Sequence, residues 1–221
     1  MEALTIALKQ GGEVSALLVR PQAARACYVF AHGAGAGMTH RFMEDVASGL
    51  ADREIATLRY QFPYMENGSK RTDTPAVAQA TVRAAVAEAT RRCPDLPLVA
   101  GGKSFGGRMT SQAQAVEPLP GVRGLVFLGF PLHPAGKPSS DRAAHLGEIR
   151  IPMLFVQGTR DKLAEPALIG PVVAALPSAS RHEVEAADHS FHVPARSGRT
   201  DREAMTEILD AVAGWVRVTV A

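Results

Sequence analysis

The chain has 221 residues, of which 46% are hydrophobic and 21% charged, and its 24 Lys and Arg nearly balance its 22 Asp and Glu. These values are ordinary for a globular protein, and we expect a single domain over residues 1–221 with one large core. The basic residues form no block, zinc-finger spacing or aromatic-basic ribbon, which excludes nucleic acid as an expected partner.

The N-terminal segment and the cysteines predict a compartment. Residues 1–14 lack the basic start and the long apolar stretch of a signal peptide. No apolar run has the length needed to span a membrane. We therefore expect a cytoplasmic protein without a membrane partner. Cys27 and Cys93 form no CxxC pair, and we interpret them as buried or partly buried free thiols.

Short apolar runs alternate along the chain with longer segments of helical periodicity. Expected strands are 4–8, 14–19, 26–31, 55–58, 98–100, 124–128, 153–156 and 180–185, the last being polar enough for a sheet edge. Expected helices are 39/40–50, 75–92, 105–116, 166–176 and 201–216, and expected loops are 62–73 and 130–141. This alternation predicts an α/β fold with a mostly parallel sheet of about eight strands and helices on both faces. Ligands of such sheets bind at the carboxyl ends of the strands.

The stretch GGKSFGG, residues 101–107, fits two motifs. A phosphate-binding loop, G-x-x-x-x-G-K-S, would need a glycine at position 97, but Pro97 has no N–H to offer a phosphate. A nucleophile elbow, G-x-S-x-G, is complete in Gly102, Ser104 and Gly106, and it lies between an expected strand and an expected helix. The sharp turn strains the serine and brings strand and helix so close that the glycine positions exclude side chains. We therefore interpret Ser104 as a nucleophile at a helix N-terminus.

A serine hydroxyl needs a histidine to take its proton and a carboxylate to hold that histidine in place. Asp161 lies in the turn beyond the strand 153–156, and His189 lies on the loop before the last helix, in the order this scaffold requires. His192 competes for the role of base. Asp188 competes for the role of acid, although an immediate neighbour rarely reaches back to its own histidine's ring. No third ligand stands near the two histidines, so no metal site is expected.

Two backbone N–H groups are expected to stabilise the oxyanion of an acyl-transfer reaction. One belongs to Phe105, which follows the nucleophile. The other belongs to Ala34 in the segment HGAGAG, residues 32–37, where small residues such as Gly33 let the backbone approach a substrate. The segment also begins like the dinucleotide loop G-x-G-x-x-G, but the third glycine is replaced by Met38.

Basic and apolar residues flank the expected site. Lys103 precedes the nucleophile and Arg108 follows one helical turn later, and the pair either binds an anionic substrate or is solvated and paired with Asp or Glu. Phe130, Leu132 and His133 are expected to line the acyl side of the pocket, and Gly33 and Lys103 are the other expected substrate-binding residues. Between residues 130 and 151 there is room for a loop and one or two helical turns but not for a large cap. We therefore expect a shallow and open site.

Several motifs in this order carry a family resemblance. HGAGAG, GGKSFGGR, FLGFPLHPAGKP, LFVQGTRDKL and ADHSF resemble the α/β-hydrolase superfamily from the third expected strand to the last expected helix. More narrowly, they look like the small predicted hydrolases related to the testis-expressed hydrolase-like protein and an NSL-complex regulatory subunit. The resemblance implies an α/β-hydrolase fold with a Ser104, Asp161 and His189 triad and no cofactor.

The residues and the resemblance together favour a serine hydrolase that acts on a small carboxylic ester or thioester. A peptidase or a C–C bond hydrolase uses the same machinery and is not separated by sequence. A hydrolase-fold interaction protein with an idle triad is the alternative from another class. Neither the oligomeric state nor a physiological partner is predicted by the sequence.

Overall fold

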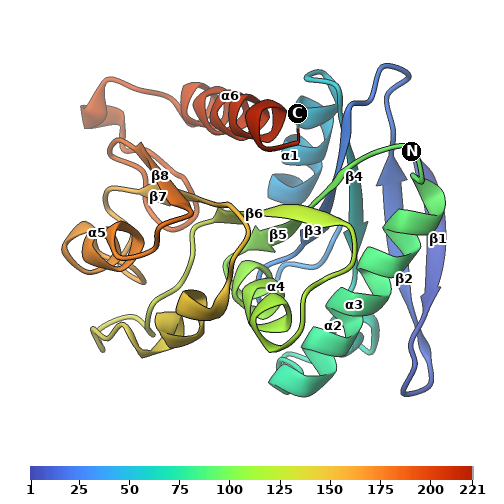
Figure 1. Cartoon of the computed structure of the whole chain (residues 1–221). Helices are drawn as coiled ribbons and strands as arrows, with labels where there is room; N and C mark the ends of the chain where they lie inside the picture. Colours follow the sequence, from blue (N-terminus) through green and yellow to red (C-terminus); the bar gives the residue numbers. More distant parts are fainter. Residues whose placement is uncertain (221) are drawn as a thin grey trace.

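The computed structural model describes residues 1–220, and Ala221, the last residue of the expected domain, lies outside the described residues. Its centre is one eight-stranded sheet with the strand order β1-β2-β4-β3-β5-β6-β7-β8 (Figure 1). The strands are β1 (Glu2–Ala7), β2 (Glu13–Val19), β3 (Ala26–Ala31), β4 (Ile55–Tyr60), β5 (Leu98–Lys103), β6 (Val122–Leu128), β7 (Met153–Gly158) and β8 (Ala179–Val184). The pairs β1–β2 and β2–β4 are antiparallel, and every pair from β4–β3 to β7–β8 is parallel.

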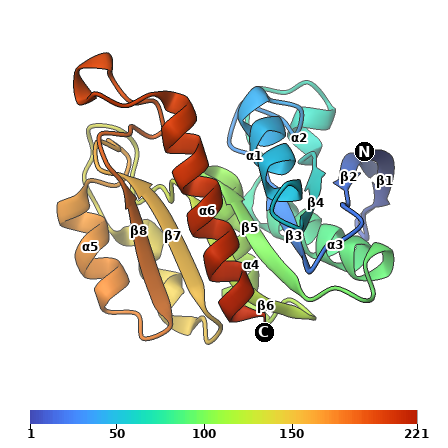
Figure 2. The same ribbon diagram turned by 90° about the horizontal axis from the view of Figure 1, so that it is seen from above.

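Helices cover both faces of the sheet (Figures 1 and 2). The helices are α1 (Arg41–Ala51), α2 (Pro63–Glu66), α3 (Pro75–Arg92), α4 (Phe105–Val116), α5 (Pro166–Ala174) and α6 (Asp201–Thr219). On one face, α1 and α6 pack on side chains such as Tyr28 and Phe30. On the other face, α3, α4 and α5 pack on side chains such as Phe127 and Phe155. None of the helices in residues 1–220 is long and apolar enough to cross a membrane.

Burial explains why the strands could be recognised from apolar runs. Every residue of β3, β4 and β7 is buried, because each of these strands has neighbours on both sides and helices on both faces. In β8, at the end of the sheet, only Val184 is buried, which fits the edge position expected for this polar strand. The predicted α/β fold with a mostly parallel sheet is therefore confirmed.

Three expectations change in detail. The expected loop 62–73 contains the short helix α2, which Pro63 begins and whose Tyr64 is buried. β5 runs three residues beyond the expected end because pairing with β3 continues to Gly102 and pairing with β6 continues to Lys103. After residue 130, the chain forms a loop and a 3₁₀ helix at Asp141–Glu148, as the spacing predicted, and no larger cap follows. Cys27 and Cys93 are both buried and free, as expected.

The parallel arrangement gathers four segments at one edge of the sheet. The residues that follow β3, β5, β7 and β8 all leave the carboxyl ends of parallel strands. They are the segments 32–37, 104–107, 159–163 and 185–193. Three of these segments hold the expected serine, aspartate and histidine, so the topology brings distant parts of the chain to one place.

Candidate active site

Ser104 occupies a strained turn between β5 and α4. Its φ of 49° and ψ of −114° are rare for a residue with a side chain. A Cβ at Gly102 would lie 2.3 Å from the Ala31 carbonyl oxygen, and a Cβ at Gly106 would lie 2.5 Å from that of His32. Both positions therefore exclude any larger residue, as the sequence predicted. Strain of this kind is kept only where the surroundings enforce it.

The structure joins the three expected residues by hydrogen bonds. Ser104 Oγ lies 2.8 Å from His189 Nε2, and His189 Nδ1 lies 2.7 Å from Asp161 Oδ2. Because an ionised carboxylate only accepts, Nδ1 carries the proton and donates to Asp161. Nε2 is then free to accept the proton of the serine hydroxyl. The tautomer needed by a general base is thus set by the carboxylate.

Asp161 is held by two further donors besides the histidine. Its carboxylate is 1% exposed, and it accepts from the Leu163 N–H at 2.8 Å and from Gln157 Nε2 at 2.6 Å. The side-chain oxygen Oε1 of Gln157 in turn accepts from the Phe130 N–H at 3.0 Å. Sequence analysis did not single out Gln157. Its signal was a polar side chain near the end of an apolar buried strand, where a hydrogen-bond partner is required.

The two competing residues have other partners. His192 Nδ1 lies 3.0 Å from the Asp201 carboxylate, and that carboxylate raises the pKa of His192. Asp188 Oδ1 accepts from the backbone N–H groups of Ser190 at 2.7 Å and His192 at 3.1 Å. Both side chains therefore shape the loop that carries His189 and do not contact Ser104.

The segment after β3 lies against Ser104. A Cβ at Gly33 would be 3.8 Å from Ser104 Cβ, and Ala34 is exposed beside it. Within residues 1–220, the backbone N–H groups of Ala34 and Phe105 donate to no other group, so both are free to bind a ligand oxygen. This is the arrangement expected of oxyanion donors.

His32 supports this segment and was not identified from the sequence. Its ring is fully buried, and burial lowers the pKa of His32 to about 4, so the imidazole is neutral. Nε2 accepts from the Phe62 N–H at 3.1 Å, and Nδ1 therefore donates to the Gly33 carbonyl at 2.8 Å. The Tyr64 hydroxyl accepts from the Gly35 N–H at 3.2 Å. A histidine next to glycine after a buried strand was the available signal.

A family profile described as an alpha/beta hydrolase domain matches residues 24–217, which is most of the chain. The chain belongs to the α/β-hydrolase family. The fold is similar to a dienelactone hydrolase from Anabaena variabilis, with a TM-score of 0.80 at 20% identity over 100% of this chain and 98% of that one. It is also similar to a serine hydrolase without a lid from Xanthomonas campestris, with a TM-score of 0.75 at 19% identity over 97% and 94%. A third similar structure is Est1E from Butyrivibrio proteoclasticus with bound ferulic acid. Its TM-score is 0.75 at 15% identity, over 98% of this chain and 99% of that one.

Three residues expected to line the substrate pocket of this α/β-hydrolase are instead part of its core. Phe130 and Leu132 are 0% exposed, and His133 is 1% exposed. The His133 ring lies between the Pro134 carbonyl at 2.9 Å and the Glu165 carboxylate at 2.6 Å. The chain turns inward after β6 because its apolar side chains pack under the Asp161 loop. The expectation that these residues meet substrate is therefore wrong.

The two basic residues beside Ser104 are both partly buried, and their polar groups differ in their partners. Lys103 Nζ donates to the His189 carbonyl oxygen at 2.5 Å. Arg108 Nε is buried and has no hydrogen-bond partner among residues 1–220. Neither side chain forms an ion pair with Asp or Glu in that part of the chain, so the expected pairing with an acidic residue is wrong.

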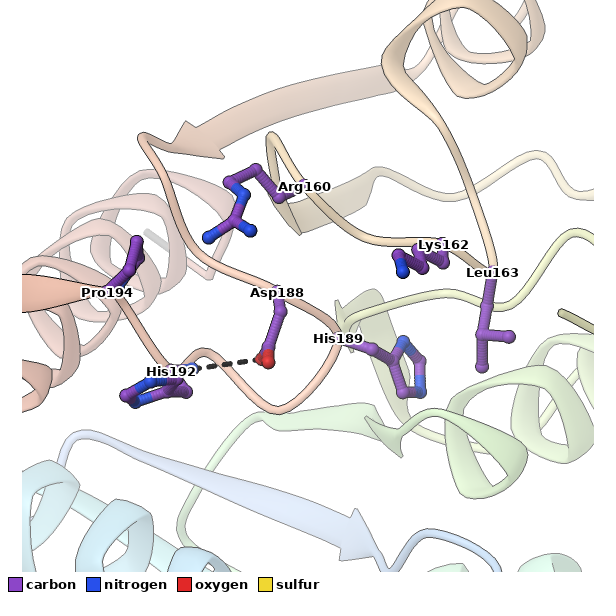
Figure 3. Close-up of a pocket in the computed structure, with 7 residues that line it drawn as sticks. All are labelled: Arg160, Lys162, Leu163, Asp188, His189, His192 and Pro194. Carbon is purple, nitrogen blue, oxygen red and sulfur yellow. Dashed lines mark hydrogen bonds between the residues drawn. The ribbon is translucent and has the colours of Figure 1, made fainter. Parts of the chain in front are cut away.

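An open pocket adjoins the histidine of the hydrolase. It has a volume of about 520 Å³ and lies between the loops that follow β7 and β8 (Figure 3). Its walls are formed by Arg160, Lys162, Leu163, Asp188, His189, His192 and Pro194. Charged side chains of both signs, Arg160, Lys162 and Asp188, are among the residues that line it. Its walls come from two separate loops, and the sequence alone did not reveal them.

A second serine–histidine pair lies further along α4. Ser111 Oγ is 2.7 Å from His145 Nε2 and 2.9 Å from the Arg108 carbonyl oxygen. Because a carbonyl only accepts, the hydroxyl donates to Arg108, and His145 Nε2 donates to the hydroxyl oxygen. Burial and the nearby Arg108 lower the pKa of His145 to about 4. No carboxylate contacts this histidine within residues 1–220.

Proposed function

We propose that Ser104, His189 and Asp161 form the catalytic triad of a serine hydrolase for small carboxylic esters or thioesters. The observation that carries this proposal is the hydrogen-bonded chain of the three side chains at the carboxyl edge of the sheet. Ser104 Oγ attacks the carbonyl carbon while His189 Nε2 takes the hydroxyl proton. Asp161 stabilises the resulting imidazolium. The histidine then gives the proton to the leaving alcohol or thiol.

The free N–H groups of Ala34 and Phe105 support the rest of the reaction. Both would donate to the negative oxygen of the tetrahedral intermediate, and the N-terminus of α4 adds its dipole at the same point. After the leaving group departs, Ser104 carries the acyl group. A water molecule attacks this acyl-enzyme as His189 takes the proton of the water. The proton finally returns to Ser104, and the acid product leaves.

The shape of the site supports a small substrate. A loop and a 3₁₀ helix stand where a cap would otherwise cover the serine, and the pocket beside His189 is open. Solved structures of similar fold include an esterase domain from Rhodothermus marinus and the hydrolases named above, which favours ester chemistry. On the motifs alone, we also propose kinship with the hydrolases related to the testis-expressed hydrolase-like protein.

Covalent labelling tests the proposed function. A fluorophosphonate probe reacts only with an activated serine, so the wild-type protein is expected to be labelled and Ser104→Ala is expected not to be. Ser111→Ala removes the hydroxyl of the other serine–histidine pair and is the matched control, with labelling retained. Hydrolysis of a panel of short esters, thioesters and amides should follow the same pattern. Absence of labelling in the wild type, or labelling that survives Ser104→Ala, contradicts the proposal and favours an idle site.

A further inference from the structure

Lys103 links the serine and the histidine by a route that the triad does not include. It is the last residue of β5 and stands immediately before Ser104. Its side chain crosses to the loop after β8, where Nζ donates to the carbonyl oxygen of His189 at 2.5 Å. A hydrogen bond with a charged donor is shorter and roughly twice as strong as one between neutral groups. One residue thus ties the strand of the nucleophile to the main chain of the base.

The Lys103 ammonium is closely surrounded by two aromatic rings and by the residue after β6. Nζ lies 5.1 Å from the ring centroid of Phe191 and 5.8 Å from that of Phe42, within the range of a cation–π contact. The two rings are stacked, with centroids 5.8 Å apart and planes at 10°. A Cβ at Gly129 would lie 2.8 Å from Nζ, so the residue after β6 leaves only enough room for the amine.

The loop that receives this hydrogen bond needs support. Ala186 and Phe191 both have positive φ angles, 61° and 65°, a backbone conformation that is strained in residues other than glycine. The Ala186 N–H is held by Thr159 Oγ1 at 2.8 Å. At the other end, the Phe191 ring stacks on the Phe42 ring, and the Lys103 ammonium lies 5.1 Å from the Phe191 centroid. The lysine therefore contacts both the strained residue and the histidine itself.

We propose that Lys103 is a positioning residue, which fixes the main chain of His189 relative to Ser104 so that Nε2 stays within reach of the hydroxyl proton. The inference rests on the proposed function. Asp161 orients the imidazole ring through Nδ1, whereas Lys103 restrains the backbone from which that ring extends. A misplacement of about 1 Å between reacting groups costs a reaction on the order of 10²-fold. The amine of Lys103 is turned toward the histidine loop, where it donates to the His189 carbonyl oxygen.

The ammonium group of Lys103 loses its proton at a lower pH than an ordinary lysine. Burial lowers the pKa of Lys103 to about 8, while the carboxylates of Asp161 and Asp188 favour its charged form. The rings of Phe42 and Phe191 beside Nζ carry no charge. The titratable imidazole of His189 adjoins the same space, since a Cβ at Gly129 would lie 2.8 Å from Nζ and 3.4 Å from His189 Nδ1. As the pH rises through about 8, the ammonium loses its proton and the charge assistance of the hydrogen bond disappears.

A pair of methionine variants tests the inference. Lys103→Met keeps the length and the apolar stem but removes the donor, and Lys137→Met changes an exposed lysine in the loop before the 3₁₀ helix. With an ester that the wild type hydrolyses, we expect kcat of Lys103→Met to fall at least tenfold and KM to change less than threefold. Lys137→Met should match the wild type. Lys103→Arg, which keeps charge and donors, should recover most of the loss.

Hydrogen exchange gives a second measurement that does not depend on turnover. We expect amides in residues 186–193 to exchange at least tenfold faster in Lys103→Met than in Lys137→Met, with unchanged exchange in the core strands. In the wild type, the same amides should exchange increasingly fast above pH 8, after correction for the intrinsic rate. The pH series uses the unaltered protein, so it decides the inference even if Lys103→Met does not fold.

Two results would overturn the inference. One is unchanged exchange of residues 186–193, both in Lys103→Met and across the pH series. The other is a kinetic loss found wholly in KM, which would make Lys103 a substrate contact. Failure of the proposed function looks different, because the wild type would then neither hydrolyse an ester nor react with the fluorophosphonate. In that case the exchange result still decides whether the lysine restrains the loop.

Discussion

The structure contains two serine–histidine hydrogen bonds of nearly equal length, but the surroundings of the two pairs differ. Ser104 and His189 are 2.8 Å apart, and Ser111 and His145 are 2.7 Å apart. The first pair stands at a strained turn with a buried carboxylate behind the histidine. The second pair lies between the middle of α4 and a 3₁₀ helix, and its serine is fully buried.

The difference between the pairs is the direction of the proton. Asp161 holds the proton of His189 on Nδ1, which leaves Nε2 as an acceptor. The Ser111 hydroxyl donates its proton to the Arg108 carbonyl oxygen, and His145 therefore donates to Ser111 Oγ through Nε2. A histidine that already donates to a serine has no capacity to take that serine's proton. The distance between two side chains is thus a poor guide to a nucleophile unless the other partners of each are known.

Asp161→Asn should give His189 the same proton position as His145, on Nε2. We expect this change to have the largest effect on kcat. The amide would donate to His189 Nδ1 and force the proton onto Nε2. We expect kcat to fall on the order of 10⁴-fold, the loss that a wrong tautomer causes in a serine triad. Ester hydrolysis by the purified variant measures this loss. Retention of more than a tenth of the wild-type rate would show that Asp161 does not set the tautomer.

Gly106→Ala tests the second difference between the two pairs, which is the strained turn at Ser104. The new Cβ would lie 2.5 Å from the His32 carbonyl oxygen, so strand and helix must separate. We expect a loss of about 1–3 kcal/mol in the free energy of unfolding, as for other overpacked sites, and a fall in kcat of tenfold or more.

Gly214→Ala is the matched control for that change, because nothing lies within 4 Å of the added Cβ in α6. It should leave kcat unchanged and stabilise the protein by up to about 1 kcal/mol through helix propensity. Urea unfolding and ester hydrolysis provide both readouts. Equal stability of the two alanine variants would mean that the close contact at residue 106 is relieved at no cost.

The smallest expected effect is the contribution of His145, in the second pair, to the stability of the protein at acid pH. The folded protein holds the pKa of His145 at about 4, below its ordinary value of 6.5, so the unfolded chain binds more protons between these values. The contribution of His145 to stability is therefore complete above pH 6.5 and is lost as the pH falls toward 4. Because the side chain is partly exposed, we expect about 1 kcal/mol or less.

His145→Gln isolates this contribution. The urea midpoint of the variant should fall less between pH 7.5 and pH 5 than that of the wild type. His32 also titrates near pH 4, but it is present in both proteins and cancels in the comparison. An identical fall in the two proteins would show that the neutral form of His145 is not favoured by folding.

Much of the site could be predicted because its signals are local. The glycines at 102 and 106 are required by steric contacts within one turn, and they mark Ser104 with little help from the rest of the chain. The positions of Asp161 and His189 followed from the order of strands, because parallel strands end at a common edge. The burial of Phe130, Leu132 and His133 could not be predicted in the same way. An apolar segment after a strand looks the same whether it lines a pocket or fills a core.

The amino-acid sequence by itself determined the strands, the helices and the elbow at Ser104, since hydrophobic periodicity and the absence of side chains act over neighbouring residues. Only the tertiary structure decided the partners of the polar groups. Lys103 looked like a solvated or substrate-binding cation until its amine was seen to donate to His189, a residue far along the chain. Hydrogen bonds of this kind join whatever the fold brings within about 3 Å, and no local pattern records them.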